Sequence, residues 1–190
     1  YLGDTAADGG ARLSLLDELI DQDEPVQNML LVEALEKGGE VMHFSRSVGI
    51  ESHGLRKALE PWKPSNQDAV AYIGECLQRL LRFALVEDEV GGRAKQAISN
   101  DFRALVGAGF IDFVESAVTQ IVAAQGRYWP PALASLGDII TYDEGGTPKE
   151  IVDRVHAMIA MVSPDELKGR LKLLVTEMPW DYPCDEKLDF

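Results

Sequence analysis

Metal binding and acid–base catalysis are the first chemistries to consider in this sequence of 190 residues, and one pair of residues allows them. Asp153 and His156 lie three residues apart in a stretch with helical periodicity, so both can face the same side of one helix. A carboxylate and an imidazole at this spacing can share a metal ion, but the ion needs further ligands from other helices. The pair supports a helical-bundle enzyme or metal-binding protein only as an alternative interpretation.

Other chemical motifs are missing from the sequence. There is no His-Glu-x-x-His motif, and no Gly pair is followed by the Gly-Lys-Ser/Thr of a phosphate-binding loop. Cys76 falls on the apolar face of an expected helix with no base nearby in the sequence, which is typical of a small core residue. We therefore expect no cofactor, and a catalytic function is less favoured than a binding function.

Aromatic residues next to prolines are a second candidate for function. Trp62 lies in Pro-Trp-Lys-Pro, Trp129 in Arg-Tyr-Trp-Pro-Pro, and Trp180 and Tyr182 in Pro-Trp-Asp-Tyr-Pro. All three tryptophans thus fall at breaks between expected helices, where they could close the ends of helix pairs. Alternatively, Trp129, Trp180 and Tyr182 are aromatic anchors for a protein partner, a role in which Trp and Tyr are enriched.

The charge is strongly acidic, with 32 Asp and Glu against 18 Lys and Arg and a net charge of −14. Such a chain is unsuited to direct nucleic-acid binding, because phosphate neutralisation needs clustered basic residues. An acidic docking face for a basic protein partner remains possible, and so does an acidic decoy that imitates nucleic acid. Lys168, Arg170 and Lys172 interrupt the acids locally and weigh against the decoy.

The expected location is the cytoplasm. Cys76 and Cys184 are the only cysteines, which is no disulfide framework, and neither a signal peptide nor a membrane-spanning run is visible. We expect no membrane partner. Because the chain begins with Tyr1, we expect a fragment or subunit of a larger intracellular protein; its oligomeric state stays open.

Residues 13–38 hold the most informative pattern for the fold. Two apolar helical stripes flank the polar turn 21–24, and Pro25 suits the first turn of the second helix. The stripes consist of Leu13, Leu15, Leu16, Leu19 and Ile20, and of Val26, Met29, Leu30, Val32, Ala34 and Leu35. This order of leucine-rich helix, acidic turn, Pro-Val and second apolar helix resembles one HEAT-type repeat.

The resemblance implies a stack of helix pairs that binds other macromolecules along an extended surface. On the turn and the following helix, the candidate partner-binding residues are Asp21, Asp23, Glu24, Gln27 and Asn28. The function we expect is a non-catalytic protein–protein interaction or scaffold module whose partner has a basic surface.

The rest of the chain predicts about nine helices in all and no strand. Further helices are expected at 40–62 (two short ones), 66–89, 93–106, 110–122, 132–140, 148–162 and 164–175. Predicted helix starts are Ser65, Thr147 and Ser163, and predicted helix ends are the pairs Gly38–Gly39 and Gly91–Gly92.

The predicted fold is all-α, an irregular α-helical repeat of the HEAT-like α-α superhelix type, with a compact helical bundle as the alternative. Residues 1–11 are expected to be a flexible segment, 12–178 a single helical-repeat domain, and 179–190 an acidic and aromatic tail.

Overall fold

A computed structural model describes residues 7–40 and 62–164 of the chain. In these two ranges the protein forms eight α-helices packed together, with no β-strand, so the predicted all-α class is confirmed. The helices are α1 (Gly9–Ile20), α2 (Pro25–Gly39), α3 (Asn66–Ala84), α4 (Glu89–Asn100), α5 (Phe102–Gly107), α6 (Ile111–Gln125), α7 (Pro130–Asp138) and α8 (Lys149–Val162). Residues 41–61 and 165–190, which hold nearly all of the helices predicted within 40–62 and 164–175 and the whole tail 179–190, lie outside the described residues.

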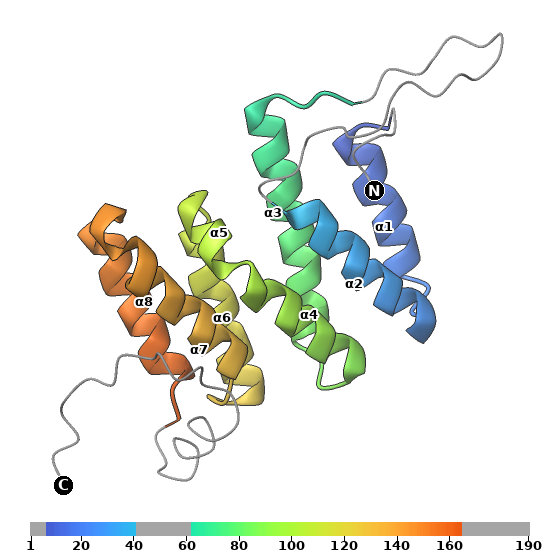
Figure 1. The fold of residues 1–190 in the computed structure, drawn as a ribbon. Helices are drawn as coiled ribbons and strands as arrows, with labels where there is room; N and C mark the ends of the chain where they lie inside the picture. The colour runs from blue at the N-terminus through green and yellow to red at the C-terminus, as the bar shows by residue number, and fades with distance from the viewer. Residues whose placement is uncertain (1–6, 41–61, 165–190) are drawn as a thin grey trace, which may run out of the picture.

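The helices pack in two layers. In one layer α2 contacts α4 and α4 contacts α7; in the other α1 contacts α3, α3 contacts α6 and α6 contacts α8. Packing of α2 and α4 on α3, and of α7 on α8, joins the layers. Figure 1 shows α1 and α2 at one side of the molecule and α7 and α8 at the opposite side. Position along the chain therefore corresponds to position along the molecule.

The central helix α3 follows directly from the sequence. Its apolar residues recur with a period near 3.6, and the buried ones form a single face against its neighbours. They are Tyr72, Ile73, Cys76, Leu77, Leu80, Leu81 and Ala84. The predicted start at Ser65 is confirmed, because the Ser65 hydroxyl accepts from the Asp68 N–H and the Asp68 carboxylate accepts from the Ser65 N–H.

The pair Gly91–Gly92 does not end α3, so this prediction is wrong. The helix ends at Ala84, and both glycines lie in the first turn of α4, where the Asp88 carboxylate accepts from the Gly91 N–H at 2.7 Å. A Cβ added at Gly91 would lie 1.9 Å from the Val86 carbonyl oxygen. Glycine is required here because the chain turns back against its own backbone.

Two further local predictions are corrected. The single helix expected at 93–106 is divided at Asp101 into α4 and α5. Thr147 does not cap α8, because its hydroxyl donates to the Asp143 carbonyl at 2.8 Å and Pro148 occupies the cap position. A π-helical turn (Ile139–Asp143) and a 3-10 turn (Glu144–Gly146) precede α8, and the Thr147 hydroxyl bonds to the last residue of the π-helical turn.

At the N-terminal side, α1 starts earlier than expected. Gly9 is its first residue and the Asp8 carboxylate accepts from the Ala11 N–H at 2.8 Å, so residues 9–11 are helical. The second helix ends at Gly39 as predicted, with Glu40 at the cap position. A Cβ at Gly38 would lie 2.9 Å from the Cys76 Sγ, so α2 and α3 approach closely there.

Candidate functional site

The turn between α1 and α2 is braced by two side chains of α2. Gln27 Nε2 donates to the Leu19 carbonyl at 2.9 Å, at the end of α1. Asn28 Nδ2 donates to Asp23 Oδ1 at 2.9 Å, and Asp23 has a left-handed backbone with φ of 51°. Aspartate tolerates that conformation better than most residues. The predicted binding residues Gln27 and Asn28 thus have a structural task, and both are only partly exposed.

The carboxylates of the same turn point to solvent. Asp21, Asp23 and Glu24 are all exposed, and these three predicted residues lie together in the short turn that joins α1 and α2 into a hairpin. We call residues 9–40 the acidic hairpin. Between residues 11 and 40 the sequence holds eight Asp and Glu but two Lys and Arg.

Three large apolar residues of the acidic hairpin are also exposed, against the sequence-based prediction. Val26 is 81% exposed and Leu30 is 62% exposed, although both were assigned to the buried stripe of the second helix. Instead Leu31, Val32 and Leu35 face the core. Apolar residues occur on several sides of α2, so the sequence alone could not decide which side is buried. Leu15 on α1 is exposed in the same way.

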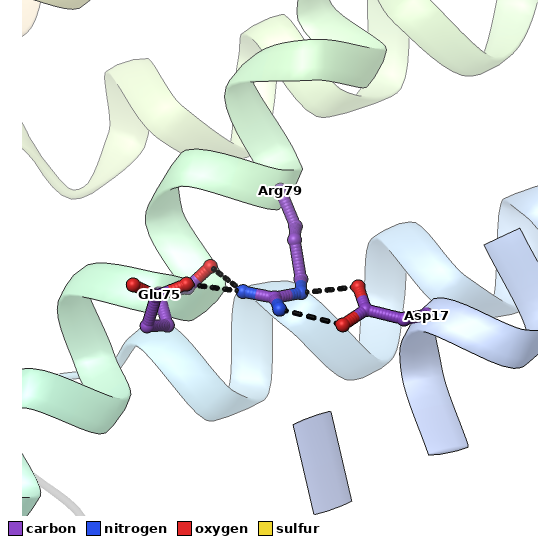
Figure 2. A network of polar contacts seen from close by, with 3 residues as sticks. All are labelled: Asp17, Glu75 and Arg79. Atoms are coloured by element: carbon purple, nitrogen blue, oxygen red, sulfur yellow. Dashed lines mark hydrogen bonds and ion pairs between the residues drawn. The ribbon is translucent and has the colours of Figure 1, made fainter. Parts of the chain in front are cut away.

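An arginine attaches α1 to the rest of the fold. Arg79 of α3 donates from Nε and Nη2 to the two Asp17 oxygens, each at 2.7 Å, and from Nη1 to Glu75 Oε2 at 2.6 Å. Figure 2 shows its guanidinium between the two carboxylates. The Arg79 hydrogen bond lowers the pKa of Asp17 below its usual value. This two-pronged contact is the strong form of a charge-assisted hydrogen bond.

A second arginine attaches α2. Arg93 of α4 pairs with Glu36, and Lys37 pairs with Glu40 within the hairpin region. Near these groups, burial together with Glu36 and Glu40 raises the pKa of Asp101 to about 6. Burial is the larger cause of this shift, and the two glutamates of the acidic hairpin add to it where the hairpin meets α4 and α5.

Trp129 is not on the surface. Its side chain is 2% exposed, its ring meets Phe102 edge-on at 5.5 Å between centroids, and the Lys95 ammonium lies 5.3 Å from the ring centre. In this position it packs in the core at the start of α7 and cannot contact a partner. Trp180 and Tyr182 lie outside the described residues.

The pair Asp153 and His156 is exposed on α8. Asp153 lines an open groove of about 610 Å³ between α6 and α8, together with Glu115, Lys149, Glu150, Arg154 and Ala157. Arg154 crosses this surface and donates to Asp112 at 2.7 Å and to Glu115. Within residues 7–40 and 62–164, no three His, Cys, Asp or Glu side chains are placed to hold a metal ion.

Comparison with known proteins gives no match. No protein-family model matches the chain, and neither a curated protein nor a solved structure is significantly similar to it. Among the helices that the structure describes, none is long and apolar enough to cross a membrane.

Proposed function

We propose that this chain is a non-catalytic protein-interaction module that binds a partner with a basic surface through its acidic hairpin. The observation that supports this most is the excess of exposed carboxylates at Asp21, Asp23 and Glu24, in a hairpin with eight acids and two bases. A dense negative surface attracts a basic partner and accelerates its association.

The layered packing is consistent with an irregular HEAT-like array. Consecutive helices such as α2 and α3, or α7 and α8, pack across the two layers, and the ends of the chain's described part lie at opposite sides of the molecule (Figure 1). An array of this kind has an extended surface and two free ends, which suits a scaffold. The acidic hairpin is one of these ends.

A pair of charge-reversed variants tests the proposal. In the hairpin variant, Glu18→Lys, Asp21→Lys and Glu24→Lys replace exposed acids, while Asp23 keeps its side chain because of its left-handed backbone. The matched control carries Asp138→Lys, Glu144→Lys and Asp153→Lys, which are also exposed residues and change the net charge by the same amount. Both variants and the unmodified chain are used to capture partners from lysate of the native host, and the proteins are identified by mass spectrometry.

We expect the unmodified chain and the control to capture the same basic protein, and the hairpin variant to lose it. Capture should weaken as salt rises from ~50 to ~300 mM, because exposed charges are screened. Equal capture by all three proteins, or capture of no specific protein in any condition, would refute an acidic interaction module.

A further inference from the structure

The exposed apolar residues of α2 lie along one line on the helix. Val26 and Leu30 are four residues apart, which places one above the other on the same face, and Glu33 continues that face after Leu30. All three are exposed. We call Val26, Leu30 and Glu33 the outer strip of α2; it spans about 10 Å of helix, roughly two turns.

Acidic groups border the outer strip. Asp21 and Glu24 lie at its start in the turn, Glu33 lies at its far end, and all three carboxylates are exposed. The face of α2 opposite the strip is already used, since Leu31, Val32 and Leu35 pack in the core. The strip thus offers apolar contact area beside three exposed carboxylates, and core packing leaves it uncovered. The exposed base that continues this face, Lys37, is paired with Glu40.

We infer that the outer strip of α2 binds an amphipathic helix with a basic polar face, which rests on the interaction function proposed above. Leucine-type residues of that helix would cover Val26 and Leu30, and its lysines or arginines would reach Asp21, Glu24 and Glu33. Anchors one and two turns apart on the bound helix match the spacing of the strip. The apolar contacts supply affinity, and the charges supply orientation and fast association.

Charge decides between this occupant and others. A second copy bound about a two-fold axis would bring the same carboxylates against one another, and facing like charges oppose association. Nucleic acid and anionic membrane surfaces carry the same sign as the strip's border. A basic helix is the occupant whose charge complements the strip and whose shape matches it.

The test uses the full chain and a defined probe. The probe is a fluorescently labelled peptide of leucine and lysine, about 18 residues long, with leucines at the helical spacing i, i+3, i+4 and i+7. A scrambled peptide of the same composition has no apolar face and serves as the peptide control. Binding is measured by fluorescence anisotropy at ~50 and ~300 mM salt.

Two double variants locate the site. Val26→Gln with Leu30→Gln removes the apolar contacts of the strip. Val70→Gln with Val86→Gln changes two other exposed valines elsewhere in the fold, which are 53% and 51% exposed. We expect the strip variant to bind the amphipathic peptide about tenfold more weakly and the control variant to stay within about twofold of the unmodified chain.

The outcomes that would contradict the inference can be told apart. If the scrambled peptide binds as tightly as the amphipathic one, or if both double variants bind like the unmodified chain, the contact is charge alone or lies elsewhere. The inference then fails while the proposed acidic interaction module stands. If neither peptide binds at either salt concentration, the inference fails, and the capture experiment decides the proposed function separately. A concentration-dependent dimer in light scattering that the strip variant abolishes would assign the strip to a second copy.

Discussion

The two ends of this molecule carry exposed acids in different settings. At the α6–α8 end, Arg154 donates to both Asp112 and Glu115, so a cation lies among the carboxylates of the exposed groove. At the acidic hairpin, Arg79 and Arg93 pair with Asp17 and Glu36 on the side that meets α3 and α4. The turn and outer strip keep their carboxylates exposed beside Val26 and Leu30.

This difference shows that exposed acidic residues alone do not make a docking surface. Both ends are acidic, but two exposed aliphatic side chains one helical turn apart combine with the acids on the outer strip of α2. At the other end the exposed Tyr142 ring already lies 5.3 Å from the Arg103 guanidinium. Exposed charges by themselves contribute little binding energy, because water screens them and already solvates them well. Apolar area that becomes buried supplies affinity, and the charges around it select the partner. The comparison makes the hairpin the better candidate for a binding site.

Detaching the hairpin should have a large effect on stability. Replacing Gly38 with Leu puts a side chain where even a Cβ would lie 2.9 Å from the Cys76 Sγ and 3.4 Å from the Tyr72 hydroxyl. We expect a loss of roughly 2–3 kcal/mol in the free energy of unfolding, as for an overpacked helix contact. Urea unfolding gives this value, and hydrogen exchange should show protection lost in α1 and α2 before α6 and α8.

Gly92→Ala is a control in which the added Cβ has room. A Cβ at Gly92 meets nothing within 4 Å, and the residue lies in the first turn of α4. The free energy of unfolding should stay the same or rise by up to ~1 kcal/mol, because alanine favours the helix. A loss at Gly92 equal to that at Gly38 would show that close approach of α2 and α3 is not the cause.

The two arginines allow a direct comparison of the ends. The Arg79 side chain is 12% exposed and that of Arg154 is 27% exposed, although each donates to two carboxylates. Arg79→Met should lower the free energy of unfolding by roughly 1–2 kcal/mol, since Asp17 loses a charge-assisted, two-pronged partner. Arg154→Met should cost less, because water replaces its bonds more easily. Urea unfolding of the two variants in parallel checks the order, and a larger loss for Arg154 would contradict it.

The crowded carboxylates at the inner side of the hairpin predict a pH effect. Burial and the charges of Glu36 and Glu40 raise the pKa of Asp101 to about 6, above its ordinary value of 3.8. The folded state therefore binds this proton more tightly than the unfolded state, and stability is lost as pH rises from about 4 to about 6. The asparagine of an Asp101→Asn variant does not ionise, so the variant avoids this loss of stability.

The Asp101→Asn variant should be more stable than the unmodified chain at pH 7.5 and close to it at pH 4. The gain at neutral pH is about 1 kcal/mol, after the pKa difference is reduced for solvent screening of a partly exposed group. Urea unfolding at the two pH values measures it. A difference that is the same at both pH values would mean that the proton is not involved.

Sequence was sufficient for elements with one clear periodicity and one clear start. The stripe of α3 behind Ser65 needed no other information, and Pro25 marked the start of α2. The sequence was insufficient to predict the buried face of α2, which is apolar on several sides. Only the packing of α3 and α4 against α2 decides that Leu31 is buried and Leu30 is exposed. Helix periodicity says which residues share a face, but not which of two apolar faces finds a partner.

The candidate site shows the same limit. The exposed acids of the turn were found from the sequence, since a polar run between two helices lies at the surface. The sequence did not predict the bracing of the turn by Gln27, because its hydrogen bond to the Leu19 carbonyl crosses the turn and depends on the angle between α1 and α2. The bond from Arg79 to Asp17 spans 62 positions of the chain and leaves no local signal.

The smallest expected effect is that of the outer strip on stability. Val26→Gln with Leu30→Gln should leave the free energy of unfolding within ~0.5 kcal/mol, because both side chains are mostly in water already. On the same helix, Leu31→Ala should cost roughly 2–4 kcal/mol, since Leu31 is 3% exposed and its loss leaves a cavity. Thermal and urea unfolding compare the two. If the strip variant also loses several kcal/mol, Val26 and Leu30 serve the fold and are not free to bind. If the strip variant loses no stability, folding does not explain why two apolar residues lie on that exposed face. Binding of a partner then explains them, and the carboxylates beside them support this explanation.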